Sequence, residues 1–248
     1  MPRAPRAVIC DVDGCLVPPR GESWDFAGLG RIAEMSGKNQ VKLALCSGRP
    51  PAFQEALARA LLISSYCICE NGALLMHPLT KHLIVHPNVP REFLTERPNI
   101  IAEIQKLVAG TSTVVEFGKE VLISVNPPNK EELPHLLQAV KDILHGLPVA
   151  LFNSGRSVEV VPKGVTKDAG LALWSEIEGI PVSLVTSIGD ADNDLDILGA
   201  AGTAAAPANC TPAVRNIVDY VSPYPMVEGV LDILSQVQQE ELPGLQKG

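Results

Sequence analysis

The stretch Ala7-Val8-Ile9-Cys10-Asp11-Val12-Asp13-Gly14 decides how this chain of 248 residues is interpreted. Its first four residues are apolar and predict a short buried strand. Two carboxylates two positions apart at the end of a strand point roughly the same way, and the glycine after them permits a sharp turn. Because neighbouring like charges raise each other's pKa, the pair indicates a divalent-metal site that handles phosphate. The alternative is two solvated carboxylates in a turn.

A second apolar run, Leu43-Ala44-Leu45-Cys46, ends at Ser47-Gly48-Arg49. Pro50 and Pro51 follow and suit the first turn of a helix. We therefore expect Ser47 beside a helix N-terminus, where free backbone N–H groups favour an anion. An ordinary N-cap serine is the alternative.

Lys167 marks a third segment, at the start of a predicted helix for which Thr166 is a suitable N-cap. A lysine at this end of a helix is mildly unfavourable against the helix dipole. This small penalty indicates another role, such as holding a phosphate as a point charge. A solvated surface lysine is the more common case.

The fourth segment is Gly189-Asp190-Ala191-Asp192-Asn193-Asp194, which follows an expected strand over 182–188. The spacing of its acids is that of a calcium loop, but Leu195 and Ala201 stand where an EF-hand requires glycine and glutamate. What remains is an acidic site at a strand end, with Asp194 on the helix that follows. Ligands bind at the carboxyl ends of strands in an open parallel sheet, so the four segments are expected to share one crevice.

The order of these segments resembles that of the haloacid dehalogenase-like hydrolases, chiefly phosphatases. Threonine usually follows the first-motif glycine in that family, and Cys15 stands there in this chain. The resemblance implies an α/β fold, with a three-layer Rossmann-like core around a parallel sheet and an inserted α+β cap domain. The residues that match the family's four motifs are, in order, Asp11-Val12-Asp13-Gly14, Ser47, Lys167, and Gly189-Asp190 with Asn193-Asp194.

By this resemblance, Asp11 is the nucleophile that forms an aspartyl-phosphate, and Asp13 is the general acid and base. The implied cofactor is Mg²⁺, which prefers oxygen ligands and phosphate substrates. Asp11, Asp190 and the main-chain carbonyl of Asp13 would hold it, with Asp194 binding directly or through water. The residues implied to bind the substrate are Ser47, Gly48, Arg49, Lys167 and Asn193.

Residues 88–162 are predicted to form the cap, and residues 1–87 with 163–248 the core. Between the second and third motifs, a helix-strand-strand pattern occurs twice, which gives the order αββαββ in a block large enough for a small α+β unit. The resemblance makes this insert a small sheet-containing cap that selects the substrate. Lys119 and Arg156 are candidates to meet a second anionic group of the substrate, although solvated charges are the more common case.

The leading hypothesis is a Mg²⁺-dependent phosphatase for a small phosphorylated metabolite, such as a sugar phosphate, a sugar-phosphoglycerate or phosphoglycolate. The alternatives are a phosphotransferase or phosphomutase that uses Asp11, and a non-catalytic binding module. Gly28-Leu29-Gly30 does not make a dinucleotide-binding motif, because the third glycine is missing and no strand precedes it.

The composition excludes several other classes of protein. A net charge of −8 argues against nucleic acid or an anionic membrane as a partner, and no apolar run approaches the roughly 18 residues that span a bilayer. The first residues lack the apolar stretch of a secretory signal, so we expect a cytoplasmic protein, and a homodimer through the cap sheet is compatible. The six cysteines include no Cys-x-x-Cys pair, which argues against a zinc site and favours buried free thiols.

Overall fold

The computed structural model describes residues 6–18, 22–38, 41–144, 149–153 and 156–242. The chain divides into two compact units. The first comprises Met1–Ile84 and Thr166–Gly248, and the second is Val85–Val165. Each of the four sequence segments that predict a site belongs to the first unit, so their geometry is defined within one body.

A five-stranded parallel sheet forms the centre of the first unit, in the order β12-β11-β10-β1-β2. The chain leaves β1 toward β2 on one side and returns through β10 on the other, so the order of the strands reverses beside β1. The ligand site of such sheets lies at this point, outside the carboxyl ends of the strands. The strands are β1 (Arg6–Cys10), β2 (Val41–Leu45), β10 (Val185–Ile188), β11 (Thr203–Ala206) and β12 (Tyr220–Val221).

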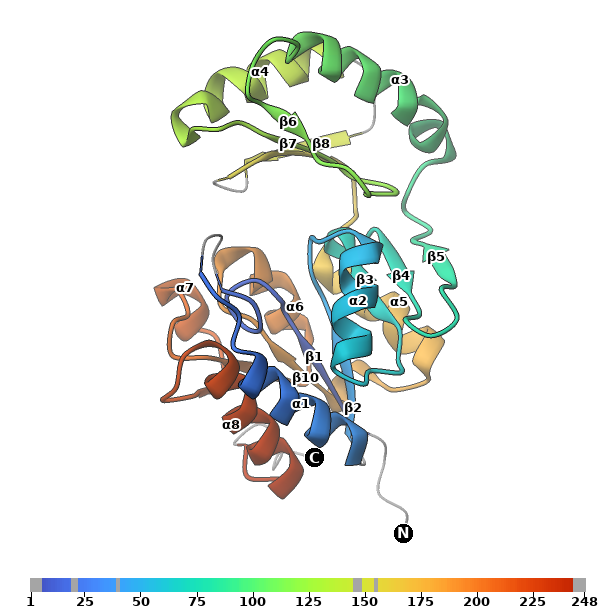
Figure 1. Cartoon of the computed structure of the whole chain (residues 1–248). Coiled ribbons are helices and arrows are strands. Elements are labelled where there is room, and N and C mark those ends of the chain that lie inside the picture. Colours follow the sequence, from blue (N-terminus) through green and yellow to red (C-terminus); the bar gives the residue numbers. More distant parts are fainter. Residues whose placement is uncertain (1–5, 19–21, 39–40, 145–148, 154–155, 243–248) are drawn as a thin grey trace. The chain divides into compact units, whose positions relative to one another are not determined.

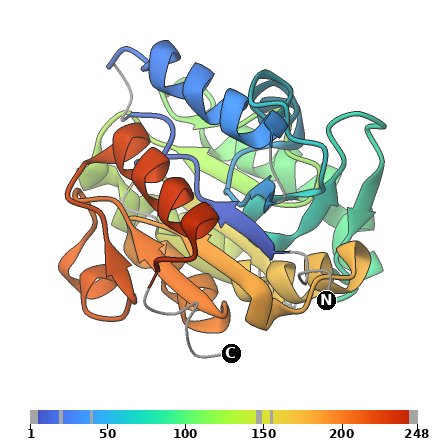
Figure 2. The ribbon, with the colours of Figure 1, turned by 90° about the horizontal axis from the view of Figure 1, so that it is seen from below.

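Helices cover both faces of this sheet and make three layers, which confirms the predicted α/β fold (Figures 1 and 2). On one face α1 (Phe26–Lys38) lies beside α8 (Met226–Gln239), and on the other α5 (Lys167–Glu178) lies beside α6 (Leu195–Ala200). Trp174 of α5 packs against the β1 side chains that point to its face, which excludes water from that side of the sheet. The remaining helices of this unit are α2 (Pro51–Ala60) and α7 (Pro212–Arg215), and the 3₁₀ turns are η1 (Glu70–Gly72), η3 (Val182–Leu184) and η4 (Asp192–Asp194).

A small second sheet joins β3 (Cys67–Cys69), β4 (Leu74–Met76) and β5 (Leu83–Val85), in that order. Within this sheet, β3 pairs with the antiparallel strand β4. The reversal occurs within η1, where Glu70, Asn71 and Gly72 have φ values of 51°, 54° and 97°. Left-handed residues in succession turn the chain back on itself. This turn follows the strand that lies next to Ser47, because Ser47 N donates to Ile68 O.

The second unit is an antiparallel four-stranded sheet in the order β6-β7-β9-β8. Helices α3 and α4 cover one face of it (Figure 1). The chain order is helix-strand-strand twice, as predicted. Residues 154–155, between the last two strands, lie outside the described residues. The elements are α3 (Arg91–Leu107), β6 (Val114–Val115), β7 (Ile123–Asn126), η2 (Lys130–Glu132), α4 (Leu133–Ile143), β8 (Val149–Asn153) and β9 (Val158–Pro162).

Two further properties follow from the coordinates. All six cysteines are free and buried, as expected for thiols that serve as small apolar side chains. Across the described ranges, no helix combines the length and the apolar character needed to cross a bilayer.

Candidate active site

The loop after β1 carries Asp11 into the carboxyl edge of the sheet. Asp11 N donates to Ile188 O at 2.8 Å, which fastens the loop to β10, and the Asp11 side chain is only 6% exposed. Gly14 then has a φ of 93°, and a Cβ at this position would lie 2.6 Å from Asp190 Cγ and overlap its carboxylate. The absence of a side chain at residue 14 therefore allows the Asp190 carboxylate to approach the first loop.

Lys167 lies in the middle of the acidic cluster, and it is buried. As the first residue of α5, it follows Thr166, whose hydroxyl accepts a hydrogen bond from Ala169 N, so the predicted N-cap is confirmed. Lys167 Nζ donates to Asp11 Oδ1 at 2.7 Å and to Asp194 Oδ1 at 2.5 Å. The side chain is 3% exposed, which excludes the solvated surface lysine.

Two glycines allow the start of α5 to pack closely against η1. A Cβ on Gly72 would lie 2.9 Å from the carbonyl carbon of Thr166, and a Cβ on Gly170 would lie 2.7 Å from Gly72 Cα. The backbones are therefore in direct contact beside Lys167. This contact determines how far the ammonium group reaches toward Asp11.

Asp194 holds both the lysine and the loop that carries Asp190. Its Oδ2 accepts hydrogen bonds from the backbone N–H groups of Asp190 at 3.0 Å and Ala191 at 3.1 Å, while Oδ1 accepts from Lys167. A side chain on Gly189 would lie 2.5 Å from Asp194 Cβ. Asp194 is completely buried, and both of its oxygens already have partners.

Acidic side chains outnumber basic ones in this cluster. Burial, and then the charge of Asp194, raise the pKa of Asp11 well above its usual value, although Lys167 opposes this effect. Burial and Asp194 also raise the pKa of Asp190, to about 7. Burial lowers the pKa of Lys167, but the charges of Asp11 and Asp194 outweigh it and raise that pKa well above its usual value. Three carboxylates around one ammonium group favour the binding of a further cation.

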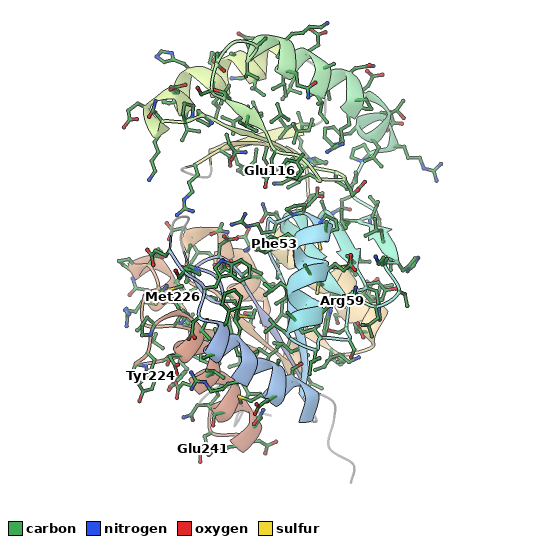
Figure 3. All side chains as sticks on the ribbon, in the orientation of Figure 1. Phe53, Arg59, Glu116, Tyr224, Met226 and Glu241 are labelled. Atoms are coloured by element: carbon green, nitrogen blue, oxygen red, sulfur yellow. The ribbon has the colours of Figure 1, made fainter. Side chains whose placement is uncertain are left out.

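Asp13 forms an ion pair that the sequence does not predict. Arg49 Nε donates to Asp13 Oδ2 at 2.9 Å and Arg49 Nη2 donates to Asp13 Oδ1 at 2.5 Å, which is a bidentate pair. The guanidinium carbon of Arg49 lies 4.9 Å from the ring centre of Phe53, which projects from α2 (Figure 3). Two planar contacts therefore fix the direction of the Asp13 side chain.

The Ser47 turn is held by backbone and amide groups. Ser47 is 2% exposed, and its hydroxyl accepts from Arg49 N at 3.2 Å. Gln54 is fully buried, and its Nε2 donates to the carbonyls of Ser47, Arg49 and Ile68 at 3.2 to 3.3 Å. Gly48 lies against the side chain of Asn71. The only sequence signal for Gln54 is an amide among the apolar residues of α2.

Not every predicted site residue makes such contacts. Asn193 lies on η4 and is exposed, and its side chain makes no hydrogen bond to any residue of the described ranges. In the second unit, Lys119 is 7% exposed and lies 3.3 Å from Glu116 (Figure 3) and 3.4 Å from Glu159. Two carboxylates already lie beside its ammonium group, so Lys119 is neither the solvated surface charge that was the more common alternative nor suited to the candidate role of binding an anion. Arg156 is exposed.

The donor atoms of the first unit fit a divalent cation. Ligand atoms of Asp11, Cys15 and Asp190 all lie within 4.8 Å of one another. The two carboxylates supply the oxygen ligands that a hard cation such as Mg²⁺ prefers. Because both oxygens of Asp194 have partners, the geometry favours an indirect role for that residue.

Comparison with known proteins identifies the family of this chain. A family model of haloacid dehalogenase-like hydrolases matches residues 8–132 and 118–234. The chain belongs to this family.

Relatives of similar length exist among archaeal proteins. A phosphoglycolate phosphatase of Methanopyrus kandleri is 35% identical over 237 residues, which cover 94% of this chain and 97% of the relative. A phosphoglycolate phosphatase of Archaeoglobus fulgidus is 25% identical, over 93% of this chain and 96% of the relative.

Solved structures share the fold at lower identity. A protein of Thermoplasma acidophilum superposes with a TM-score of 0.71 at 20% identity, over 94% of this chain and 98% of its own. A haloacid dehalogenase-like hydrolase of Bacteroides thetaiotaomicron gives a TM-score of 0.70 at 21% identity, over 94% of this chain and 99% of its own.

Proposed function

We propose that this chain, a phosphatase of the haloacid dehalogenase-like family, hydrolyses small phosphate monoesters through an aspartyl-phosphate on Asp11. The observation that carries the proposal is the buried ammonium group of Lys167 between Asp11 and Asp194. It holds a positive charge beside the nucleophile, where a phosphoryl group would develop negative charge. Phosphoglycolate is the first substrate to test, because two relatives that match more than 90% of the chain are named for it.

The reaction proceeds in two displacements. A carboxylate oxygen of Asp11 attacks phosphorus, the bond from phosphorus to the ester oxygen breaks, and Asp13 gives its proton to that oxygen. Asp13 then takes a proton from a water molecule, whose oxygen attacks the phosphorus and releases inorganic phosphate from Asp11. Lys167 and the hydroxyl of Ser47 bind the phosphoryl oxygens, and Gly48 allows the loop after β2 to lie close to the phosphoryl group.

Arg49 has one role between turnovers and another when the substrate is bound. Between turnovers, Asp13 releases to the solvent the proton that it took from water, and Arg49 holds the resulting carboxylate in the bidentate pair. Asp13 takes a proton from the solvent again when it leaves this pair. When Asp13 turns to the leaving oxygen, the guanidinium group is released to bind an oxygen of the substrate. Arg49 is a bidentate ligand for phosphate or carboxylate, so it suits a substrate such as phosphoglycolate that carries both groups. Asn193, exposed beside the Asp190 loop, makes no hydrogen bond within the described ranges that would orient Lys167 and is left to contact the substrate.

Mg²⁺ is the proposed cofactor, held by the carboxylates of Asp11 and Asp190 and by the main-chain carbonyl of Asp13. When bound, the ion neutralises charge on the phosphoryl oxygens and on the carboxylates. Asp194 acts by keeping Lys167 and the Asp190 loop in place. We also propose that the second unit, Val85–Val165, is the cap that selects the substrate.

The test is a phosphatase assay over a panel of phosphorylated metabolites, with Mg²⁺ and with a chelator as control. Release of phosphate from phosphoglycolate or a sugar phosphate, lost in the Asp11→Asn variant with unchanged circular dichroism, supports the proposal. Full activity of Asp11→Asn contradicts it. Transfer of phosphate to a sugar acceptor without free phosphate indicates a phosphotransferase instead.

A further inference from the structure

Cys15 contributes a sulfur atom to the cluster that holds the proposed metal site. Its side chain is fully buried, and its thiol donates a long hydrogen bond to Asp190 Oδ1, at 3.9 Å. The residue follows Gly14, the position at which any side chain would overlap with the Asp190 carboxylate. The turn that brings Asp190 close to Asp11 therefore also brings the Cys15 sulfur close to both.

The separation of these atoms suits two ligands of one ion. Bonds of about 2.3 Å to sulfur and about 2.1 Å to oxygen at a tetrahedral angle place the two ligand atoms about 3.6 Å apart. The observed separation of Cys15 Sγ and Asp190 Oδ1 is 3.9 Å. A shift of roughly 0.3 Å, no larger than ordinary thermal motion, is sufficient.

We propose that Cys15 is a sulfur ligand that allows this site to bind thiophilic divalent ions, such as Zn²⁺, Co²⁺ and Cd²⁺, in competition with Mg²⁺. Thiolates favour such ions, whereas carboxylates and water suit Mg²⁺. On binding, the S–H bond of Cys15 breaks, its proton leaves to the solvent, and the sulfur lone pair bonds the metal without any change of oxidation state. The proposal rests on the proposed function in one respect, that Asp11 and Asp190 bind a divalent ion.

The other buried thiols provide matched controls. Cys10 immediately precedes Asp11, but Cys10 Sγ donates to Asp11 O at 3.1 Å and is outside the group of three ligands. Cys67, on β3, is equally buried and also outside that group. A Cys67→Ser variant therefore removes a buried thiol without removing the proposed ligand.

The experiment titrates metal-stripped protein with Co²⁺ and follows the thiolate-to-cobalt charge-transfer absorption in the near ultraviolet. The wild type and Cys67→Ser show the band, and Cys15→Ser does not. Calorimetric titration with Cd²⁺ and with Mg²⁺ gives the second measurement. The ratio of Cd²⁺ to Mg²⁺ affinity falls at least about 10- to 100-fold in Cys15→Ser. Loss of a residue that merely hydrogen-bonds to a metal ligand already lowers metal affinity by this factor, and loss of a ligand itself should lower it no less. Cys15→Ala serves where the serine variant does not fold.

Two results overturn the proposal. One is a wild-type protein that binds Co²⁺ without the charge-transfer band, and the other is an unchanged ratio of affinities in Cys15→Ser. Mg²⁺-dependent hydrolysis by the wild type is measured in parallel. If that activity is present while the band is missing, only the role of Cys15 fails. If neither Mg²⁺ nor Co²⁺ binds, the metal part of the proposed function fails as well.

Discussion

Replacing Lys167 with methionine keeps the length of the side chain and removes the positive charge between Asp11 and Asp194. Both carboxylates are buried, so the variant leaves them without their cation. Breaking a buried ion pair by removing one partner costs about 3–5 kcal/mol. Alternatively, the folded variant can keep one of the two carboxyl groups protonated, and the cost of this sets an upper limit on the loss of stability. An ordinary aspartate has a pKa of about 3.9, so protonation at about pH 7.5 costs about 1.4 kcal/mol for each unit of difference, or about 5 kcal/mol.

The dependence of this loss on pH has a definite sign. Burial and Asp194 already raise the pKa of Asp11 in the folded protein, and removal of Lys167 raises it further. The folded variant then binds more protons than its unfolded chain, so its stability increases as the pH falls. Each proton taken up is worth about 1.4 kcal/mol per pH unit, and at about pH 5.5 the loss shrinks to about 2 kcal/mol.

Urea unfolding in the presence of a chelator measures both effects. Trp174 belongs to α5 and is buried in the core, so its fluorescence reports on the unit that contains the site. The exposed Lys163 supplies the control, because Lys163→Met changes the free energy of unfolding by less than about 0.5 kcal/mol. A loss below about 1 kcal/mol for Lys167→Met, or the same loss at both pH values, would refute the argument that Lys167 compensates buried carboxylates.

Three further predictions concern the metal site and the thiols. Burial and Asp194 raise the pKa of Asp190 to about 7, so a proton competes with Mg²⁺ for this carboxylate below about pH 7. Calorimetry should show the Mg²⁺ affinity falling about tenfold for each pH unit below this value, and a constant affinity down to about pH 5 contradicts the prediction. Gly14→Ala weakens Mg²⁺ binding and destabilises the fold by more than about 1–2 kcal/mol. Gly110→Ala is the control: Gly110 has a φ of 77° and no atom near the position of a Cβ, so this variant loses only the stability that backbone strain costs. Burial raises the pKa of Cys67 to about 12, so iodoacetamide at about pH 8 leaves it intact until urea unfolds the chain; rapid alkylation of native Cys67 is the opposite result.

The sequence predicts the part of the fold that local patterns determine. The apolar run before Asp11 forms β1 because a central parallel strand is buried on both faces. Thr166 caps α5 as expected, and Lys167 at the helix start is buried between Asp11 and Asp194 and is not a solvated surface charge. The hairpin of β3 and β4 was not predictable, because it depends on left-handed backbone at Glu70 and Asn71, which lack the freedom of glycine.

The contacts of the site depend on tertiary structure and leave little trace in the sequence. Arg49 contacts Asp13 because β1 and β2 are neighbouring strands with Cys10 opposite Leu45. This register cannot be read from the number of residues between Asp13 and Arg49. In the sequence Cys15 is a departure from a family motif, and only the packing of the Asp190 loop brings its thiol close to a carboxylate. The family resemblance supplied roles for individual residues that spacing alone does not supply.

The contact between α5 and η1 has a consequence for how this scaffold can diverge. Because Gly72 and Gly170 have no side chains, α5 and η1 can pack with their backbones in contact. This packing sets how close the Lys167 ammonium group lies to Asp11. A methyl group added at either glycine would push α5 outward and move the Lys167 ammonium group away from Asp11, with every acid left in place. Sequence changes that keep this ion pair must therefore occur in other parts of the chain, because the contact between α5 and η1 leaves no room for a side chain.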